Sequence, residues 1–325
     1  MFYTDINIII QKMNKAGEMH SPFLFAFNFE LTEGIFIENP FTNKEVFFKT
    51  GIYSNKTSDK VQVDAVRFDI SPISFEEYEQ KYNIIHKGLR RGDSFLTNLT
   101  ISTPIETDLC MDDIFRLSNA PYQLYIPDKF VCFSPERFVH ISNGILSTNP
   151  MKGTIDASLP DAEQTILSDF KETAEHNTIV DLLRNDISQI CRNVRVKRFR
   201  YIEHIRNRFQ NILQVSSEIE GQLPADYHSH LGDIIYQMLP AGSISGAPKN
   251  ATIDLIKKAE GGPRGYYTGI FGVYDGTNLN SAVLIRFIES RNGQLFYHSG
   301  GGITAYSNCR DEYNEVLKKI YLPFG

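Results

Sequence analysis

The chain of 325 residues contains no apolar run long enough to cross a membrane. No window approaches the roughly 18 consecutive apolar residues that a membrane-spanning helix needs. The opening residues, Met1 to Asp5, also lack the basic region that begins a signal peptide. We therefore expect a cytoplasmic protein with no membrane partner.

Cysteine is scarce, and positive charge is not in excess. The four cysteines, Cys110, Cys132, Cys191 and Cys309, are scattered without a C-x-x-C pair, so the sequence predicts neither a disulfide framework nor a zinc site. Its 33 lysines and arginines are outnumbered by 39 acidic residues, which gives a formal net charge of −6. This balance excludes a strongly basic nucleic-acid binder.

Two local patterns receive ordinary interpretations. The basic stretch 192–208 alternates with Val194 and Val196, which indicates a strand with one solvated, charged face. His228 and His230 have no third metal ligand at a suitable spacing, so they are interpreted as surface histidines.

The sequence has no repeat, low-complexity tract or Pro/Ser-rich linker, and it predicts mixed helices and strands. Residues 1–72 contain short Phe-rich runs between polar turns, and we expect a short β-rich region that packs on the same unit as residues 73–325. Ser74 and Glu77 form a capping-box pattern that predicts a helix over 74–89. Further helices are expected at 161–192, 228–239, 249–260 and 309–321, and strands at 95–101, 129–133, 138–141, 194–196, 269–273, 282–288 and 295–299.

Two glutamates lie on the apolar side of the predicted helix over 161–192. At about 100° per residue, Glu172 and Glu175 fall within roughly 60° of the apolar stripe that includes Ile179 and Leu183. Because a buried carboxylate is costly without a cation or hydrogen bonds, these side chains indicate a functional or paired site.

The C-terminal helix repeats this pattern. Glu312, Glu315 and Lys319 share one side of it with Val316. Four carboxylates on two helices, without histidine or thiolate partners, would suit a hard ion such as Mg²⁺. The alternative is that they are helix-end acids that are solvated or paired with arginine.

Two small-residue segments permit close backbone approach. Pro240–Lys249 precedes a predicted helix whose free N–H groups favour an anion, but it lacks the phosphate-loop spacing. Ser299–Thr304 fails the dinucleotide-binding pattern. Each segment alone is also consistent with a tight turn.

Taken together, seven segments have a distinctive order. They are Ser134–Phe138, Pro150–Thr154, Lys171–Asn177, Ile179–Asp186, Pro240–Lys249, Arg264–Gly269 and Ser299–Thr304. In this order they resemble the chorismate-utilising enzymes, which include the large subunits of anthranilate and aminodeoxychorismate synthases and the isochorismate and salicylate synthases. The resemblance covers about residue 73 to the C-terminus and makes 73–325 the chorismate-binding catalytic domain. It implies an α+β fold with two antiparallel β-sheets packed face to face, helices outside and a truncated N-terminal region.

One position separates the reactions of this family. Lys152 stands where anthranilate and isochorismate enzymes usually have alanine, and a lysine there resembles aminodeoxychorismate synthase. The resemblance implies that Lys152 attacks C2 of chorismate as a nucleophile, that Glu136 is the general acid for the departing C4 hydroxyl, and that ammonia then enters at C4.

The resemblance also assigns binding roles. Mg²⁺ would be held by Glu172, Glu175, Glu312 and Glu315. Substrate would be bound by Thr154, Ser245, Tyr267, Arg286, Lys319 and the backbone N–H groups of Gly301 and Gly302.

Three features depart from the family pattern. Leu96 stands where isochorismate and salicylate enzymes carry a lysine base, so water addition is disfavoured. Gln214 stands where many members have histidine. The shortened N-terminal region carries no Leu-Leu-Glu-Ser feedback motif, so we expect activity to stay constant as tryptophan is added.

The resemblance therefore implies the first component of an aminodeoxychorismate synthase, an aminotransferase that acts on chorismate on the route to 4-aminobenzoate and folate. A separate glutamine amidotransferase subunit would supply the ammonia. The alternatives are the first component of an anthranilate synthase and a catalytically silent homologue that binds chorismate or serves as a scaffold.

Overall fold

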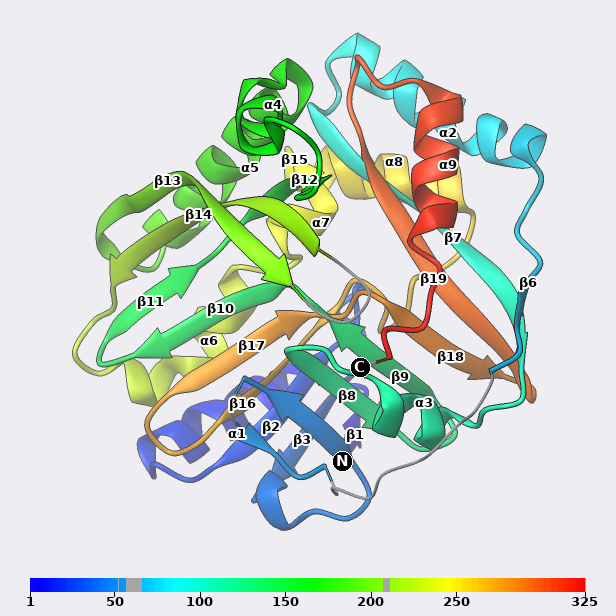
Figure 1. The fold of residues 1–325 in the computed structure, drawn as a ribbon. Coiled ribbons are helices and arrows are strands. Elements are labelled where there is room, and N and C mark those ends of the chain that lie inside the picture. The colour runs from blue at the N-terminus through cyan, green and yellow to red at the C-terminus, as the bar shows by residue number, and fades with distance from the viewer. Residues whose placement is uncertain (52, 57–65, 207–210, 325) are drawn as a thin grey trace.

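The computed structural model describes residues 1–51, 53–56, 66–206 and 211–324. They form two sheets, and every strand pair in the described residues is antiparallel. The sheets pack face to face with helices outside them (Figure 1). This confirms the architecture that the family resemblance implies.

The first sheet contains ten strands. Its order is β1 (Phe2–Tyr3), β3 (Gly34–Glu38), β2 (Phe23–Phe27), β16 (Ile270–Tyr274), β17 (Leu279–Val283), β10 (Arg137–Ser142), β11 (Ile145–Thr148), β14 (Asn211–Gln222) and β12 (Met151–Asp156), with β13 (Arg192–Arg206) paired to β14.

The second sheet contains nine strands. Its order is β15 (Gly246–Ala247), β7 (Leu96–Thr107), β19 (Gln294–Ile303), β18 (Phe287–Arg291), β9 (Phe130–Ser134), β8 (Tyr122–Ile126), β4 (Phe47–Thr50) and β5 (Tyr53–Ser54), with β6 (Phe68–Ile70) paired to β7. The N-terminal region of the chain thus contributes strands to both sheets.

Helices pack on both sheets. Those that pack on the first sheet, or on its helices, are α1 (Ile6–Glu18), α4 (Ala162–Ser168), α5 (Phe170–Ser188), η2 (Tyr227–His230) and α6 (Leu231–Gln237). The short α7 (Gly242–Ser245) contacts α5 and also β7 and β15 of the second sheet. Those that pack on the second sheet are α2 (Phe75–Arg91), α3 (Met111–Leu117), α8 (Lys249–Glu260) and α9 (Cys309–Lys318), and a short η1 (Pro40–Thr42) lies between β3 and β4.

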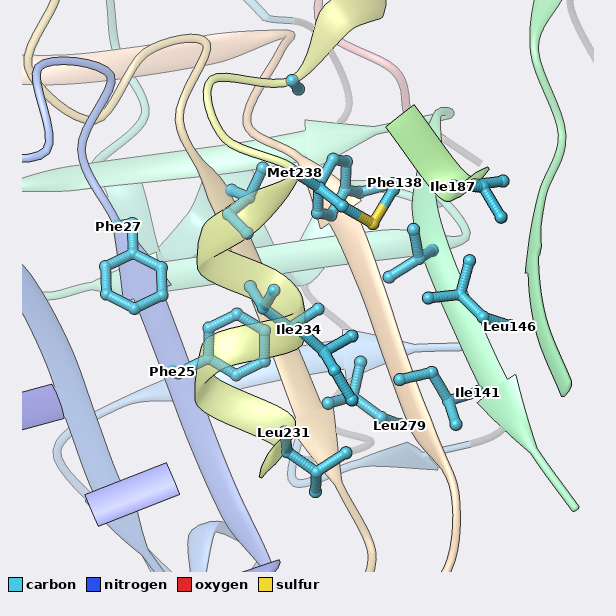
Figure 2. Packing of buried hydrophobic residues seen from close by; sticks show 14 of the residues in the cluster. Phe25, Phe27, Phe138, Ile141, Leu146, Ile187, Leu231, Ile234, Met238 and Leu279 are labelled. Carbon is cyan, nitrogen blue, oxygen red and sulfur yellow. The ribbon is translucent and has the colours of Figure 1, made fainter. Parts of the chain in front are cut away.

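Alternation along the strands builds two layers of core. On β2, Phe25 and Phe27 pack against the helices outside the first sheet, as Figure 2 shows around α6. Leu24 and Ala26 point to the opposite face and join Leu124 of β8 between the two sheets. This period of two is expected for a strand buried on both faces.

Several predicted elements agree with the structure. The helix over 74–89 is α2, and the Ser74 hydroxyl accepts the Glu77 N–H at its start. The helix over 249–260 is α8. Arg195, Lys197 and Arg198 on β13 form exposed ion pairs with β14, which confirms the solvated strand face.

Other predicted elements are wrong in detail. The single strand over 282–288 is two strands in different sheets, because Arg286 adopts a φ of 54° and the chain crosses from β17 to β18. The long helix over 161–192 is interrupted at Asp169, which caps α5 by accepting the Glu172 N–H. The segment 6–18, within the region expected to be β-rich, is the helix α1.

Two smaller interpretations also change. Gly300 to Ile303 pair with β7 as part of β19 and do not form a turn. His228 is not a simple surface residue, because its ring stacks on Tyr227 and its Nδ1 lies 2.8 Å from the Tyr274 hydroxyl.

No helix in the described part of the chain is long and apolar enough to span a membrane.

Candidate active site

A bulge in β12 accompanies the approach of Lys152 to the second sheet. Lys152 pairs with Val215 and Thr154 with Gln214, so one extra residue, Gly153, is accommodated at a φ of 78°. A Cβ atom on Gly302 of the second sheet would lie 3.4 Å from the Lys152 amine. Lys152 therefore reaches from the first sheet to the glycine-rich part of β19.

The acidic residues of α5 meet this lysine. The Lys152 Nζ lies 3.8 Å from Oε2 of Glu175, which is only 8% exposed. Oε1 of Glu175 is buried without a hydrogen-bond partner. Glu172 is half-buried on the same side of α5, and its Oε2 would lie 3.3 Å from a Cβ on Gly153. The predicted inward orientation of the two glutamates is confirmed.

The second acidic pair faces the first from α9. Glu312 is 1% exposed, and a Cβ on Gly301 would lie 3.5 Å from its Oε2. The Lys171 amine bridges the two helices, at 3.1 Å from Oε1 of Glu312 and 3.9 Å from Oε1 of Glu175. Sequence reasoning missed Lys171, although its place one turn before Glu175 in a buried acidic pattern could have indicated it.

Burial dominates the electrostatics of the α5 acids. It raises the pKa of Glu172 and of Glu175, and the neighbouring Lys152 and Lys171 ammonium groups oppose that rise. Glu315 behaves differently, because its Oε1 lies 2.7 Å from the Lys319 amine, which outweighs burial and holds the pKa of that carboxyl below its usual value.

These carboxylates match Mg²⁺ in kind, and one of them, Glu175, has a buried oxygen without a hydrogen-bond partner. In this conformation, no three His, Cys, Asp or Glu side chains of the described residues are grouped closely enough to hold a metal ion. The Lys171 ammonium lies between the two acidic pairs instead.

Glu136 is a half-buried residue just before β10. Burial raises the pKa of its carboxyl, and the Ser243 hydroxyl and the Lys152, Arg286 and Lys319 cations oppose that rise. Sequence reasoning missed Ser243, which lies two residues from the predicted Ser245 in the small-residue loop. A carboxyl with a raised pKa among hydrogen-bonding partners is suited to proton donation.

Two further cations that act on Glu136 are Arg286 and Lys319. Arg286 has a buried Nε without a hydrogen-bond partner and lies 5.4 Å from the ring centre of Tyr321. The Lys319 amine donates to the Gly300 carbonyl at 2.9 Å and would lie 4.0 Å from a Cβ on Gly301. Burial lowers the pKa of Lys319, and Glu315 opposes that shift.

The other predicted substrate residues have varied surroundings. Tyr267 is buried in the link before β16, with its ring 5.0 Å from that of His298. Thr154 is exposed on β12. Ser245 is fully buried, and its hydroxyl donates to the Ala241 carbonyl at 3.1 Å. Within this loop it is Ser243 that opposes the burial-raised pKa of Glu136.

An apolar side chain lies close to Lys152 on β7. Leu96 is 3% exposed, and its Cδ1 would lie 3.2 Å from the same Gly302 Cβ that would lie 3.4 Å from the lysine amine. The arrangement thus combines an amine, a carboxyl with a raised pKa, buried acids, two cations and an apolar wall, which suits acid-assisted substitution on an anionic substrate.

Comparison with known proteins gives consistent matches. Residues 41–324 match the family model described as chorismate binding enzyme. An uncharacterized PabA-like protein of Haemophilus influenzae is 46% identical over 316 residues, which cover 97% of this chain and 96% of that protein. Aminodeoxychorismate synthase component 1 of Bacillus subtilis is 31% identical, with 82% of this chain and 58% of that protein covered. Anthranilate synthase component 1 of Mycolicibacterium smegmatis is 33% identical, with 76% and 50% covered.

Solved structures support the fold. Anthranilate synthase component I of Streptococcus pneumoniae has a TM-score of 0.64 and 30% identity, with 78% of this chain and 58% of that chain covered. An isochorismate synthase of Bacillus anthracis, described as putative and 2,3-dihydroxybenzoate-specific, has a TM-score of 0.74 over 98% of this chain and 89% of that chain. Because it is only 19% identical, this second match concerns the fold alone.

Proposed function

Because the chain belongs to the family of chorismate-binding enzymes, we propose that it is the first component of an aminodeoxychorismate synthase, which replaces the C4 hydroxyl of chorismate by an amino group. The observation that carries this proposal is the position of Lys152, whose amine projects between Glu175 and Gly302. Anthranilate synthases, which carry out the rival reaction, usually have alanine at this position.

The proposed reaction has two substitutions. The Lys152 ammonium group first gives one proton to bulk water. Its amine then forms a bond to C2 of chorismate, the ring double bond shifts, and the C4 hydroxyl leaves as water with the proton of Glu136. The lysine nitrogen, which the attack leaves positively charged, gives its surplus proton to bulk water, and Glu136 takes a proton back from water. Ammonia then bonds to C4, the double bond shifts back, and the C2–lysine bond breaks, which yields 4-amino-4-deoxychorismate and restores the lysine.

The other side chains around Lys152 would serve substrate binding and reaction selectivity. Arg286 and Lys319 provide positive charge for the two carboxylates of chorismate. Leu96 presents methyl groups beside Lys152, so this wall offers no base to activate water. Glu172, Glu175, Glu312 and Glu315 would hold Mg²⁺, which when bound would neutralise the ring carboxylate of the substrate.

We also propose a glutamine amidotransferase subunit as the source of ammonia. Two of the relatives are named as component 1, and this supports a second component for those proteins. The product would feed 4-aminobenzoate and folate synthesis through a separate lyase.

The test is the identity of the product. The purified chain is incubated with chorismate, Mg²⁺ and ammonium at mildly alkaline pH, and the products are separated and identified by liquid chromatography and mass spectrometry. We expect aminodeoxychorismate, which a separate lyase converts to 4-aminobenzoate. Anthranilate would instead support the rival function suggested by the relatives of that name. Chorismate that binds but remains unchanged, even with an amidotransferase subunit present, would support a silent homologue.

A further inference from the structure

Two links between the sheets lie side by side. One joins β9 to β10 and carries Glu136, and the other joins β17 to β18 and carries Arg286. The Val283 N–H donates to the Glu136 carbonyl at 3.2 Å, and the Phe133 N–H donates to the Arg286 carbonyl at 3.0 Å. Backbone hydrogen bonds therefore hold the link that carries Arg286 beside the one that carries the proposed general acid.

The guanidinium of Arg286 faces an aromatic ring. Its central carbon lies 5.4 Å from the ring centre of Tyr321, which is within the range of a cation–π contact. Its Nε is buried and has no hydrogen-bond partner among the described residues. A ring contact attracts the positive charge of a guanidinium without using its N–H donors, which can then bind a carboxylate.

The segment that carries Tyr321 is fixed at several points. The Tyr297 hydroxyl of β19 donates to the Tyr321 carbonyl at 3.1 Å. The Asn119 N–H donates to the Pro323 carbonyl at 2.9 Å, and Phe324 packs on the apolar core that includes Tyr297. Figure 1 shows this segment running from α9 toward β8 and β9. The backbone around Tyr321 is thus held by contacts that do not involve its own ring.

The same stretch of chain places the second cation proposed to bind a carboxylate. Lys319 lies two residues before Tyr321, and its amine donates to the Gly300 carbonyl at 2.9 Å. Ile320, between them, is 7% exposed and belongs to the same core as Tyr297. Both proposed carboxylate-binding cations therefore depend on the residues that directly follow α9.

We propose that Tyr321 is a positioning residue whose ring holds the Arg286 guanidinium so that its N–H groups face a carboxylate of the substrate. This inference rests on the proposed function, in which Arg286 binds chorismate. Tyr321 acts through Arg286 and needs no contact with the substrate.

The test is a double-mutant cycle of chorismate binding in the full chain. The variants are Tyr321→Leu, Tyr321→Phe, Arg286→Met and the combination Tyr321→Leu/Arg286→Met. Affinity is measured by isothermal titration calorimetry with chorismate and Mg²⁺ and without ammonium, in a Lys152→Ala background so that no lysine adduct forms. The control is Tyr236→Leu on α6, where the tyrosine is 42% exposed.

We expect Tyr321→Leu to weaken chorismate binding by about tenfold, because a desolvated cation–π contact is worth roughly that much. Tyr321→Phe retains the ring and should stay within about twofold of the original affinity. In the Arg286→Met background, loss of the ring should have no further effect, and Tyr236→Leu should bind normally. An equally large effect of Tyr321→Leu without Arg286, or a Tyr321→Phe variant as weak as Tyr321→Leu, would overturn the proposal.

A second measurement needs no substrate. The Arg286 Nε–H signal is followed by ¹H–¹⁵N NMR in the free protein, with Arg286→Lys to identify it. The signal should move in Tyr321→Leu, because the ring current is lost, and should keep its position in Tyr321→Phe and Tyr236→Leu. An unchanged signal in Tyr321→Leu would refute the positioning role. Chorismate binding without 4-amination in the unaltered chain would refute the proposed function and leave the binding cycle to decide the role of Tyr321.

Discussion

The Lys152 amine lies between the buried carboxylate of Glu175 and the backbone of Gly302 on β19. Glu175 is 3.8 Å away, and a Cβ atom at position 302 would be in contact with the amine at 3.4 Å. The sequence indicated both residues through their motifs. It could not indicate that the β12 bulge at Gly153 aims the lysine at β19, because that depends on the pairing of β12 with β14.

Replacement of Lys152 by alanine tests its role as nucleophile. We expect Lys152→Ala to reduce 4-amination by roughly 10³-fold or more, since the covalent route is then closed. The measurement is the initial rate of aminodeoxychorismate formation, with Lys318→Ala on the exposed side of α9 as control. If Lys152→Ala kept full activity and Lys318→Ala behaved the same way, Lys152 would not be the nucleophile.

The position of Lys171 between Glu175 and Glu312 leads to a prediction about metal binding. Its ammonium group partly compensates Glu175 and Glu312, so Lys171→Met should lower the melting temperature in the absence of metal by about 2–4 °C. Mg²⁺ should then raise the melting temperature more in Lys171→Met than in the unaltered chain, because no ammonium competes for the carboxylates. Thermal unfolding with and without Mg²⁺ measures both effects. An equal response to Mg²⁺ in the two proteins would argue against a metal site at these acids.

Among the elements, β7 has backbone groups that are hydrogen-bonded by side chains where no strand pairs with them. Between the segments of β7 that pair with β15 and β6, the Glu260 carboxylate accepts the Thr100 N–H at 2.9 Å. The Arg264 guanidinium donates to the Asn98 carbonyl at 2.7 Å. Asn98 and Thr100 pair with Gly302 and Gly300 on the other side of β7. The buried pair Glu260–Arg264 therefore supports the strand that lines the candidate site.

Loss of this pair should be costly. Arg264 and Glu260 are 2.6 Å apart, with side chains 2% and 8% exposed. We expect Arg264→Met to lower the free energy of unfolding by about 3–5 kcal/mol, because it leaves a buried carboxylate uncompensated. The exposed pair Arg184–Asp181 provides the control, and Arg184→Met should cost less than about 1 kcal/mol. Denaturant unfolding measures both, and equal losses would contradict this role.

Element prediction from the sequence was best where the signal was local. The cap at Ser74 and the helix α8 were correctly predicted because capping and helical periodicity are short-range properties. The crossing at Arg286 was missed because the apolar run over 282–288 fits both sheets, and only tertiary packing divides it. The effect of Ser243 on the pKa of Glu136 was missed because the two residues are more than 100 positions apart in the chain.

For the molecule as a whole, the N-terminal region is part of the same structure as the candidate site. Glu30 accepts the N–H groups of Arg264 and Gly265, next to the predicted substrate residue Tyr267. At the other side, His20 follows α1, and its ring centre lies 4.4 Å from that of His228. The composition of this region predicted strands but not the helix α1. It also could not predict these contacts, because they involve residues 200 or more positions away.

This histidine contact predicts a pH dependence of stability. Burial and the nearby His20 lower the pKa of His228, so its ring enters the folded state neutral. Below about pH 6.5, His228 is protonated in the unfolded chain but still neutral in the folded one. The free energy of unfolding therefore falls as the pH decreases toward the lowered pKa of folded His228. His228→Gln should reduce the loss of stability between pH 7.5 and 5.5, whereas the exposed His230→Gln should not. Urea unfolding at both pH values tests this, and parallel behaviour of the two variants would contradict it.

The central claim is that Lys152 becomes covalently attached to the substrate. The most direct measurement is peptide mass spectrometry of the chain after incubation with chorismate and Mg²⁺ without ammonia, followed by rapid acid quenching. The account predicts a peptide containing Lys152 whose mass is increased by chorismate less one water, and loss of this species when ammonium is added before quenching. An unmodified Lys152 peptide under conditions in which the same protein forms aminodeoxychorismate on addition of ammonium would contradict it.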